Sequence, residues 1–163
     1  MERLIINRIL ICIFALTSFG CSVQGEDNVT LPISTFDPVS IEPTLIRQHR
    51  LYGNGQENIS KQNFVIRNQS QWNGLLEKMD SVFNSSNGFT ETDIDFDSFI
   101  VIAVFDEVFE SGVRNIEITE ITEYESNVVV KVVSTQMLGT SNQPIQPYHI
   151  VKIPKILKDV VFE

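Results

Sequence analysis

The run from Phe99 to Phe105, FIVIAVF, constrains the fold of this chain more than any other segment. It contains no polar residue, whereas a strand with one face in water alternates apolar and polar positions. It is also short for a buried helix and rich in β-branched residues. The sequence therefore predicts a strand that is covered on both faces, which requires further layers of structure on either side of it.

Other segments have the alternation or the β-branched content of strands. They are Leu45–Tyr52, Asn63–Arg67, Asn115–Glu123, Asn127–Thr135 and Pro147–Lys155. The third and fourth of these flank Tyr124-Glu125-Ser126, which predicts an antiparallel hairpin. Alternation slips by one residue at Glu120-Ile121, which predicts a β-bulge. Gln136–Gln146 is expected to be a loop before the last long strand, in which Pro154 suits an edge or a terminus.

One segment has a helical period instead. Its apolar residues are Trp72, Leu75, Leu76, Met79, Val82 and Phe83. This spacing predicts one amphipathic helix that buries all of these side chains. Asn68 or Ser70 is the expected N-cap, and Asn84–Gly88 is expected to end the helix. The predicted fold class is therefore α+β: an antiparallel β-rich domain, either a sheet or a sandwich, with one amphipathic helix packed against it.

The N-terminus has the pattern of a secretory signal peptide over residues 1–20. Arg3 and Arg8 open it, and Ile9–Phe19 is an uncharged stretch too short to span a bilayer. Ser18-Phe19-Gly20-Cys21 resembles the lipoprotein box of Bacteroidetes-type bacteria, in which the cysteine after a small residue receives a diacylglyceryl group. The resemblance implies cleavage before Cys21 and lipidation of its thiol. Two alternatives stay open: a buried N-terminal helix, and a cleaved signal that leaves the cysteine unmodified.

Residues 21–43 are expected to form a flexible tether that starts at the lipidated cysteine. Pro32, Pro38 and Pro43 interrupt any regular period there. A short strand near Val39–Ile41 is the alternative. The folded domain is then expected to span residues 44–163.

The anchor would determine where the protein works. Acyl chains on Cys21 bury enough methylene groups to hold the domain at a membrane of the bacterial cell envelope. Ser22 is not the aspartate that retains lipoproteins at the inner membrane, and by analogy this favours the outer membrane. Cys12 would leave with the leader, so the mature domain would have no free thiol for a disulfide, a metal site or a nucleophile.

Charge and spacing exclude several classes of function. A formal net charge of -9 argues against a nucleic-acid partner, because phosphate binding needs clustered Lys and Arg. Asp93, Asp95 and Asp97 alternate like the start of a calcium loop, but Ser98 and Val104 occupy the positions that require Gly and Glu. We therefore expect no metal and no cofactor.

The two histidines, His49 and His149, do not predict catalysis. His149 shares a strand face with Val151 and Ile153, which predicts a partly buried histidine with a satisfied hydrogen bond. A Ser-His-acid triad would need it beside Ser111 or Ser134, and the chain has no G-x-S-x-G segment. We therefore expect no catalytic residue and no enzyme.

The stretch from Asn63 to Lys155 resembles the C-terminal domain of PrcB-type proteins. The similar segments are Asn63–Trp72, Phe96-Asp97, Phe99–Phe105, Ser111-Gly112 and the terminal PYHIVKIPK of Pro147–Lys155. A Thr-Gly-Gly-Tyr turn of that family is reduced here to Ser111-Gly112-Val113-Arg114, in which Gly112 matches. The resemblance implies a small lipoprotein with a non-catalytic accessory or stabilising role, as in a surface protease complex.

Two functional hypotheses follow. The first is a protein-binding module whose partner contacts Phe109, Gly112, Arg114, Met137 and Leu138, in the two loops that hold candidate interface anchors. Its alternative is that the apolar members simply cover the end of the core. The second hypothesis is a lipid-anchored protease inhibitor or a small-ligand-binding lipoprotein.

Overall fold

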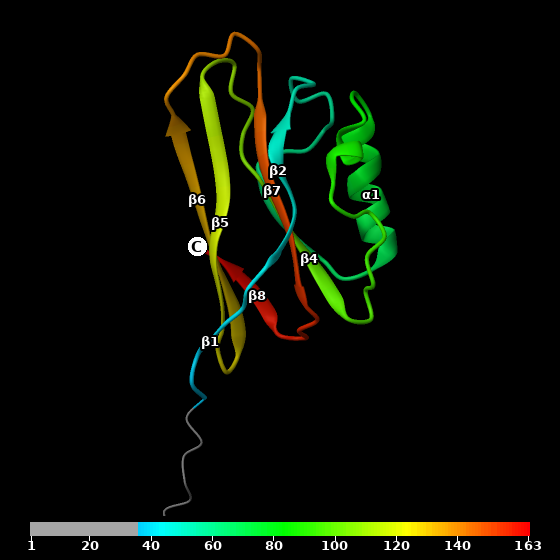
Figure 1. Cartoon of the computed structure of the whole chain (residues 1–163), viewed down its shortest axis with the longest axis vertical. Coiled ribbons are helices and arrows are strands. Elements are labelled where there is room, and N and C mark those ends of the chain that lie inside the picture. The colour runs from blue at the N-terminus through cyan, green and yellow to red at the C-terminus, as the bar shows by residue number, and fades with distance from the viewer. Residues whose placement is uncertain (1–35) are drawn as a thin grey trace, which may run out of the picture. The chain divides into compact units, whose positions relative to one another are not determined.

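The structure is a computed structural model that describes residues 36–163. The predicted leader, Cys21 and the first part of the predicted tether lie outside the described residues. Eight strands form two four-stranded sheets, and one α-helix and one short 3-10 helix accompany them. The α+β expectation is confirmed, and the sheets form a sandwich. Figure 1 shows three layers, with the helix on one side of the central sheet and the second sheet on the other.

The central sheet has the order β2-β7-β4-β3 and is antiparallel throughout. Its bounds are Thr44–Leu51 for β2, Gln62–Ile66 for β3, Phe99–Phe105 for β4 and Gln146–Pro154 for β7. The prediction for β4 is confirmed: Ile100, Ile102 and Val104 are buried in one hydrophobic cluster, and Val101, Ala103 and Phe105 are buried in another. Apolar layers on both faces explain why the strand has no polar position.

Helix α1, Gln69–Asp80, covers one face of this sheet with Trp72, Leu75 and Met79. Its N-cap is Asn68, whose side chain accepts a hydrogen bond from the Gln71 N–H at 3.0 Å. The Trp72 Nε1–H donates to the Thr92 carbonyl at 2.8 Å, so this large side chain is buried without an orphaned donor.

The prediction that the helix continues through Val82 and Phe83 is wrong. The helix ends at Asp80, whose carboxylate accepts hydrogen bonds from the backbone N–H and the hydroxyl of Ser86. These bonds turn the chain into the 3-10 helix η1, Ser85–Gly88. Phe83 is left 56% exposed instead of buried.

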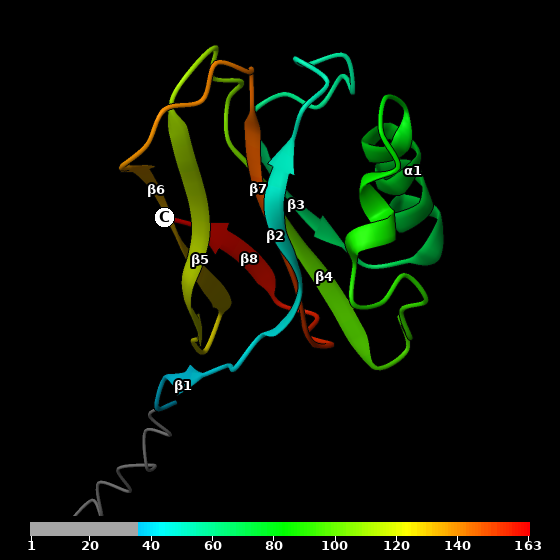
Figure 2. The same cartoon turned by 45° about the horizontal axis from the view of Figure 1, so that its top comes forward.

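The second sheet has the order β1-β5-β6-β8 and packs on the other face of the central sheet. Its bounds are Val39–Ser40 for β1, Val113–Glu123 for β5, Asn127–Met137 for β6 and Asp159–Phe162 for β8. The predicted hairpin is confirmed as β5 and β6, and the register shift between Ile118 and Glu120 confirms the bulge. Figure 2 shows this sheet and α1 on opposite sides of β7 and β4.

Three details of the second sheet differ from the sequence prediction. Val39–Ser40 pairs with β5 as β1, so the short-strand alternative holds at the end of the predicted tether. The predicted loop is shorter, because Gln136 and Met137 belong to β6 and Gln146 begins β7. Strand β8 was not predicted, because its four residues gain strand structure only by pairing in parallel with β6.

The outer edge of β5 runs beside the central sheet, and over its first half no strand within residues 36–163 pairs with it. Side chains of the central sheet replace such a strand. Arg50 Nε donates to the Arg114 carbonyl at 3.0 Å, and Gln48 Nε2 donates to the Ile116 carbonyl at 2.9 Å. The Ile118 N–H donates to Nδ1 of His149 at 2.9 Å. His149 is 7% exposed, so the predicted buried and satisfied histidine is confirmed.

The hydrogen bond from the Ile118 N–H makes stability depend on the protonation of His149, because Nδ1 accepts only when it carries no proton. Burial lowers the pKa of His149 below its ordinary value of 6.5, although Glu117 opposes the shift. The unfolded chain then binds more protons than the native state, so the free energy of unfolding falls as pH drops below 6.5 towards the lowered pKa. Above 6.5 this contribution is fully present.

We predict that His149→Gln removes much of this pH dependence, because glutamine offers an uncharged acceptor to the Ile118 N–H. Urea unfolding at a series of pH values checks the prediction. His49→Gln is the comparison variant: His49 accepts no hydrogen bond from β5 among residues 36–163, so this variant should keep the contribution of His149 and lose only the one that the lowered pKa of His49 itself makes. An unchanged pH slope in His149→Gln would show that the buried histidine does not titrate as described.

Candidate functional site

The structure brings the five predicted contact residues to one end of the sandwich. We call Phe109, Gly112, Arg114, Met137 and Leu138 the rim. They lie where β5 begins and β6 ends, at the upper end of the molecule in Figure 1. The Gly112 N–H donates to the Ser141 carbonyl at 3.0 Å, and Phe109 forms an isolated bridge with Ile145. Backbone pairing therefore holds the two predicted loops side by side.

Two arginines organise the rim side chains. The guanidinium carbon of Arg114 lies 4.7 Å from the centroid of the Phe109 ring, which is a cation–π arrangement. Arg50 Nη2 lies 3.7 Å from Sδ of Met137. Phe109 is half-buried, but Met137 is 48% exposed and Leu138 is fully exposed. Covering the end of the core therefore explains the partial burial of Phe109. It does not explain why Leu138 is fully exposed.

Strand β6 has a free edge beside the rim. Strand β8 pairs with Asn127–Val130, and one further bond joins the Val132 N–H to the Glu163 carbonyl. By the alternation of the ladder, Ser134 and Gln136 point their backbone N–H and C=O groups to this same edge. Both residues pair with β5 on their other side, but on this edge no strand within residues 36–163 pairs with them. We call residues 134–136 the β6 edge.

A polar cluster lies beneath this edge. The Asp106 carboxylate is 1% exposed; Lys61 Nζ is 2.9 Å from its Oδ1, and the Ser134 hydroxyl donates to its other oxygen. Burial opposes ionisation of Asp106, but the hydrogen bonds from Ser134 and Lys61 outweigh burial and lower its pKa. A carboxylate with a lowered pKa is a weak base, so this arrangement does not activate the Ser134 hydroxyl as a nucleophile.

The residues considered for catalysis or metal binding are not brought together. Ser134 hydrogen-bonds Asp106, whereas Nδ1 of His149 is engaged by the Ile118 N–H. Asp95 accepts from the backbone N–H of Asp97, and hydrogen bonds to Ser98 and Asp97 lower its pKa. Within residues 36–163 no group of three or more His, Cys, Asp or Glu side chains is placed to hold a metal ion. In the same range no helix is long and apolar enough to cross a membrane.

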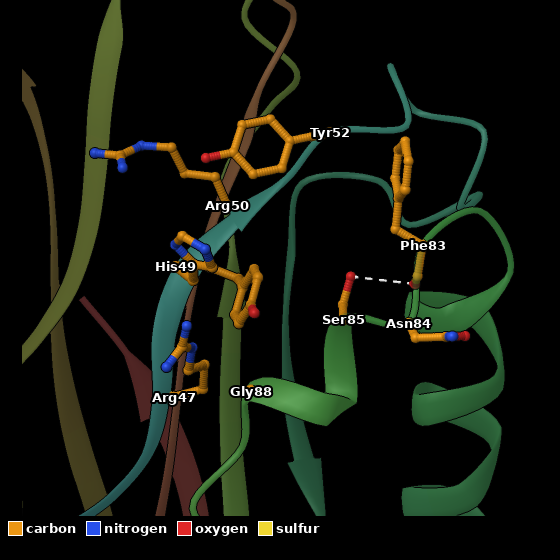
Figure 3. Close-up of a pocket in the computed structure, with 9 residues that line it drawn as sticks. Arg47, His49, Arg50, Tyr52, Phe83, Asn84, Ser85 and Gly88 are labelled. Carbon is orange, nitrogen blue, oxygen red and sulfur yellow. Dashed lines mark hydrogen bonds between the residues drawn. The ribbon is translucent and has the colours of Figure 1, made fainter.

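A pocket that was not predicted from the sequence lies between β2 and the segment after α1. The cavity has a volume of about 330 Å³, and Figure 3 shows most of its lining residues. They are Arg47, His49, Arg50, Tyr52, Phe83, Asn84, Ser85, Gly88 and Tyr148. The available signal was the Arg47-Gln48-His49-Arg50 stretch, which concentrates positive charge in a chain of net charge -9.

We predict that Gly112→Ala lowers the free energy of unfolding by about 1 kcal/mol, because an L residue is strained at its φ of 89°. A Cβ there would meet no atom within 4 Å, so the cost arises from the backbone alone. Gly74→Ala is the control: this helical position is equally open, and the substitution should raise stability by about 0.5–1 kcal/mol. Urea unfolding measures both, and a stabilised Gly112→Ala would contradict the turn geometry.

Comparison with known proteins finds no matching family model, no matching curated protein and no matching solved structure. The resemblance to the PrcB-type domain therefore stays a prediction from the sequence.

Proposed function

We propose that this chain is a non-catalytic lipoprotein of the bacterial outer membrane, anchored through Cys21, which binds a protein partner through its rim and β6 edge. The observation that carries the binding proposal is the exposure of Met137 and Leu138, 48% and 104%, at the end of an unpaired strand edge. The leader pattern and the resemblance to PrcB-type accessory subunits support the location and the class of partner.

The two parts of this surface suit an extended segment of a partner. The backbone groups of Ser134 and Gln136 offer hydrogen bonds to an added strand, which is a common mode of peptide recognition. Val133, 43% exposed, and Met137 occupy alternate positions of β6, so both lie on the outer face of the sheet. Leu138 then supplies an apolar anchor, and burying one leucine side chain is worth about 1.5–3 kcal/mol.

The rim is also pre-organised. Arg50 is held by the Arg114 carbonyl while it contacts Met137, and Arg114 stacks on Phe109. Less side-chain freedom is lost on binding when the contacting groups are already fixed. The proposed partner therefore meets an ordered surface at Met137 and a free side chain only at Leu138.

We predict that Leu138→Asp weakens partner binding by about 2 kcal/mol, roughly thirtyfold in affinity. Photo-crosslinking from position 138 in native membranes identifies the complex, and its yield in competition with each variant measures the loss. Leu157→Asp is the matched control, because Leu157 is 87% exposed but lies between β7 and β8, away from the rim.

Gln136→Pro tests the strand-addition part, since it removes an outward N–H without breaking the pairing of β6 with β5. We expect it to weaken crosslinking from position 138 as well. A crosslinked product that forms equally from positions 138 and 157 would refute this binding surface. So would a product whose yield neither Leu138→Asp nor Gln136→Pro lowers.

We predict separately that Cys21→Ser abolishes lipidation and moves the protein from the membrane fraction to the soluble fraction. Mass spectrometry of the mature N-terminus and membrane fractionation check this. Cys12→Ser is the control, because that cysteine would be removed with the leader and its loss should change neither result. An unmodified Cys21 in the native product would overturn the anchor.

A further inference from the structure

The pocket beside β2 owes its composition to a β-bulge. Leu45 pairs with Val151 and Arg47 pairs with Ile150, so Ile46 is an extra residue in β2. Beyond the bulge, Arg47 and His49 stand opposite Ile150 and Tyr148, on the face of the sheet that α1 covers. Figure 3 shows Arg47 and His49 on β2, opposite Ser85 and Asn84.

Two polar groups of this pocket lack partners. Tyr148 is completely buried, and its hydroxyl lies beside the Arg47 guanidinium but makes no hydrogen bond of good geometry with any described residue. Nε of Arg47 is also buried without a partner, and no ion pair within residues 36–163 includes this arginine. A buried donor that is left unsatisfied costs free energy, so such groups usually have a ligand or water to bind. Both groups line the same cavity.

Two of the residues that line the cavity, Arg47 and Arg50, carry a permanent positive charge. No acidic residue lines it. Arg50 lies on the opposite face of β2, where it bonds to β5, and Figure 3 shows its side chain pointing away from Phe83. Burial and the positive charges of Arg47 and Arg50 lower the pKa of His49, which keeps its imidazole neutral at neutral pH. Because the Arg50 guanidinium is engaged by the Arg114 carbonyl, Arg47 supplies the charge for a ligand, and a monoanion matches it better than a phosphate dianion does.

The pocket has an aromatic mouth. Tyr52 is 43% exposed and Phe83 is 56% exposed, and both line the cavity. Figure 3 shows their rings on either side of its upper part, Tyr52 beside β2 and Phe83 at the end of α1. An exposed phenylalanine costs free energy in water, and an apolar group placed between the two rings would recover it.

We propose that this pocket, the Arg47 pocket, binds a carboxylate attached to an apolar group. The carboxylate accepts hydrogen bonds from Nε of Arg47 and from the Tyr148 hydroxyl, and the apolar group lies between Tyr52 and Phe83. The volume of about 330 Å³ suits a small organic acid or the last residue of a peptide. Both sources present the same chemistry, and the site is separate from the rim used for the proposed partner.

The test is an NMR titration of the full chain with benzoate, with benzamide as the uncharged counterpart. We expect benzoate to shift the amide signals of Arg47, His49 and Tyr148 with a dissociation constant of about 1 mM. Benzamide and inorganic phosphate should bind at least about tenfold more weakly. A tripeptide that ends in a phenylalanine carboxylate forms the second arm: tighter binding than benzoate identifies a chain terminus as the source, and weaker binding identifies a small acid.

Variants assign the contacts. Arg47→Gln should weaken benzoate binding at least about tenfold, and Tyr148→Phe roughly fivefold. The melting temperature of Tyr148→Phe is measured alongside, so that a loss of binding is separable from a loss of folding. Lys78→Gln is the control: it removes one positive charge from an exposed position on α1 and should leave binding unchanged.

Three results would overturn the proposal. They are benzamide binding as well as benzoate, phosphate binding more tightly than benzoate, and Arg47→Gln binding benzoate like the parent chain. Absence of shifts at the pocket amides up to about 10 mM benzoate would overturn it equally. None of these results bears on the rim, so failure here is distinguishable from failure of the proposed partner binding.

Discussion

Three side chains of the central sheet hydrogen-bond the outer edge of β5, and both candidate sites depend on this contact. Gln48, Arg50 and His149 satisfy backbone groups that no strand in the described part of the chain reaches. Because they are buried or half-buried between the sheets, they fix the distance and the register of one sheet against the other. An unpaired strand edge in this position would otherwise carry an unsatisfied desolvation cost.

Because side chains alternate along β2, its polar residues lie in two different places. Gln48 and Arg50 face β5, where Arg50 also orders Met137 at the rim. Arg47 and His49 face the other way and line the pocket beside Phe83. One four-residue stretch therefore joins the sheets, organises the surface proposed for a partner and supplies the charge of the pocket. Substitutions in this stretch should be interpreted with all three roles in mind.

The fold was predictable where a segment carries its own pattern. The unbroken apolar run of β4, the hairpin of β5 and β6 and the start of α1 at Asn68 all follow from local periodicity and capping. Strands β1 and β8 were missed or left as alternatives because they are short, and their structure comes from pairing with distant residues. The end of α1 was misplaced because the bonds between Asp80 and Ser86 stop the helix before the apolar spacing does.

The rim was predictable because its members lie at the open end of a recognisable hairpin or in the segments next to it. The pocket was not, because it joins β2, the segment after α1 and Tyr148 of β7. The bulge at Ile46 also places Arg47 on a face that simple counting from Leu45 does not identify.

The position of β1 has a mechanical consequence. β1 pairs with Thr122 and Glu123 at the end of β5 opposite the rim, and two residue pairs hold it there. If the chain is anchored through Cys21, tension between the bilayer and a bound partner runs along β5 and loads these few bonds in shear. β1 would detach first and release residues 36–43, about 25 Å of extended chain, and this would also withdraw Ile41 from the cluster between the sheets. Detachment of this short strand would then limit the force that is transmitted to the rest of the domain.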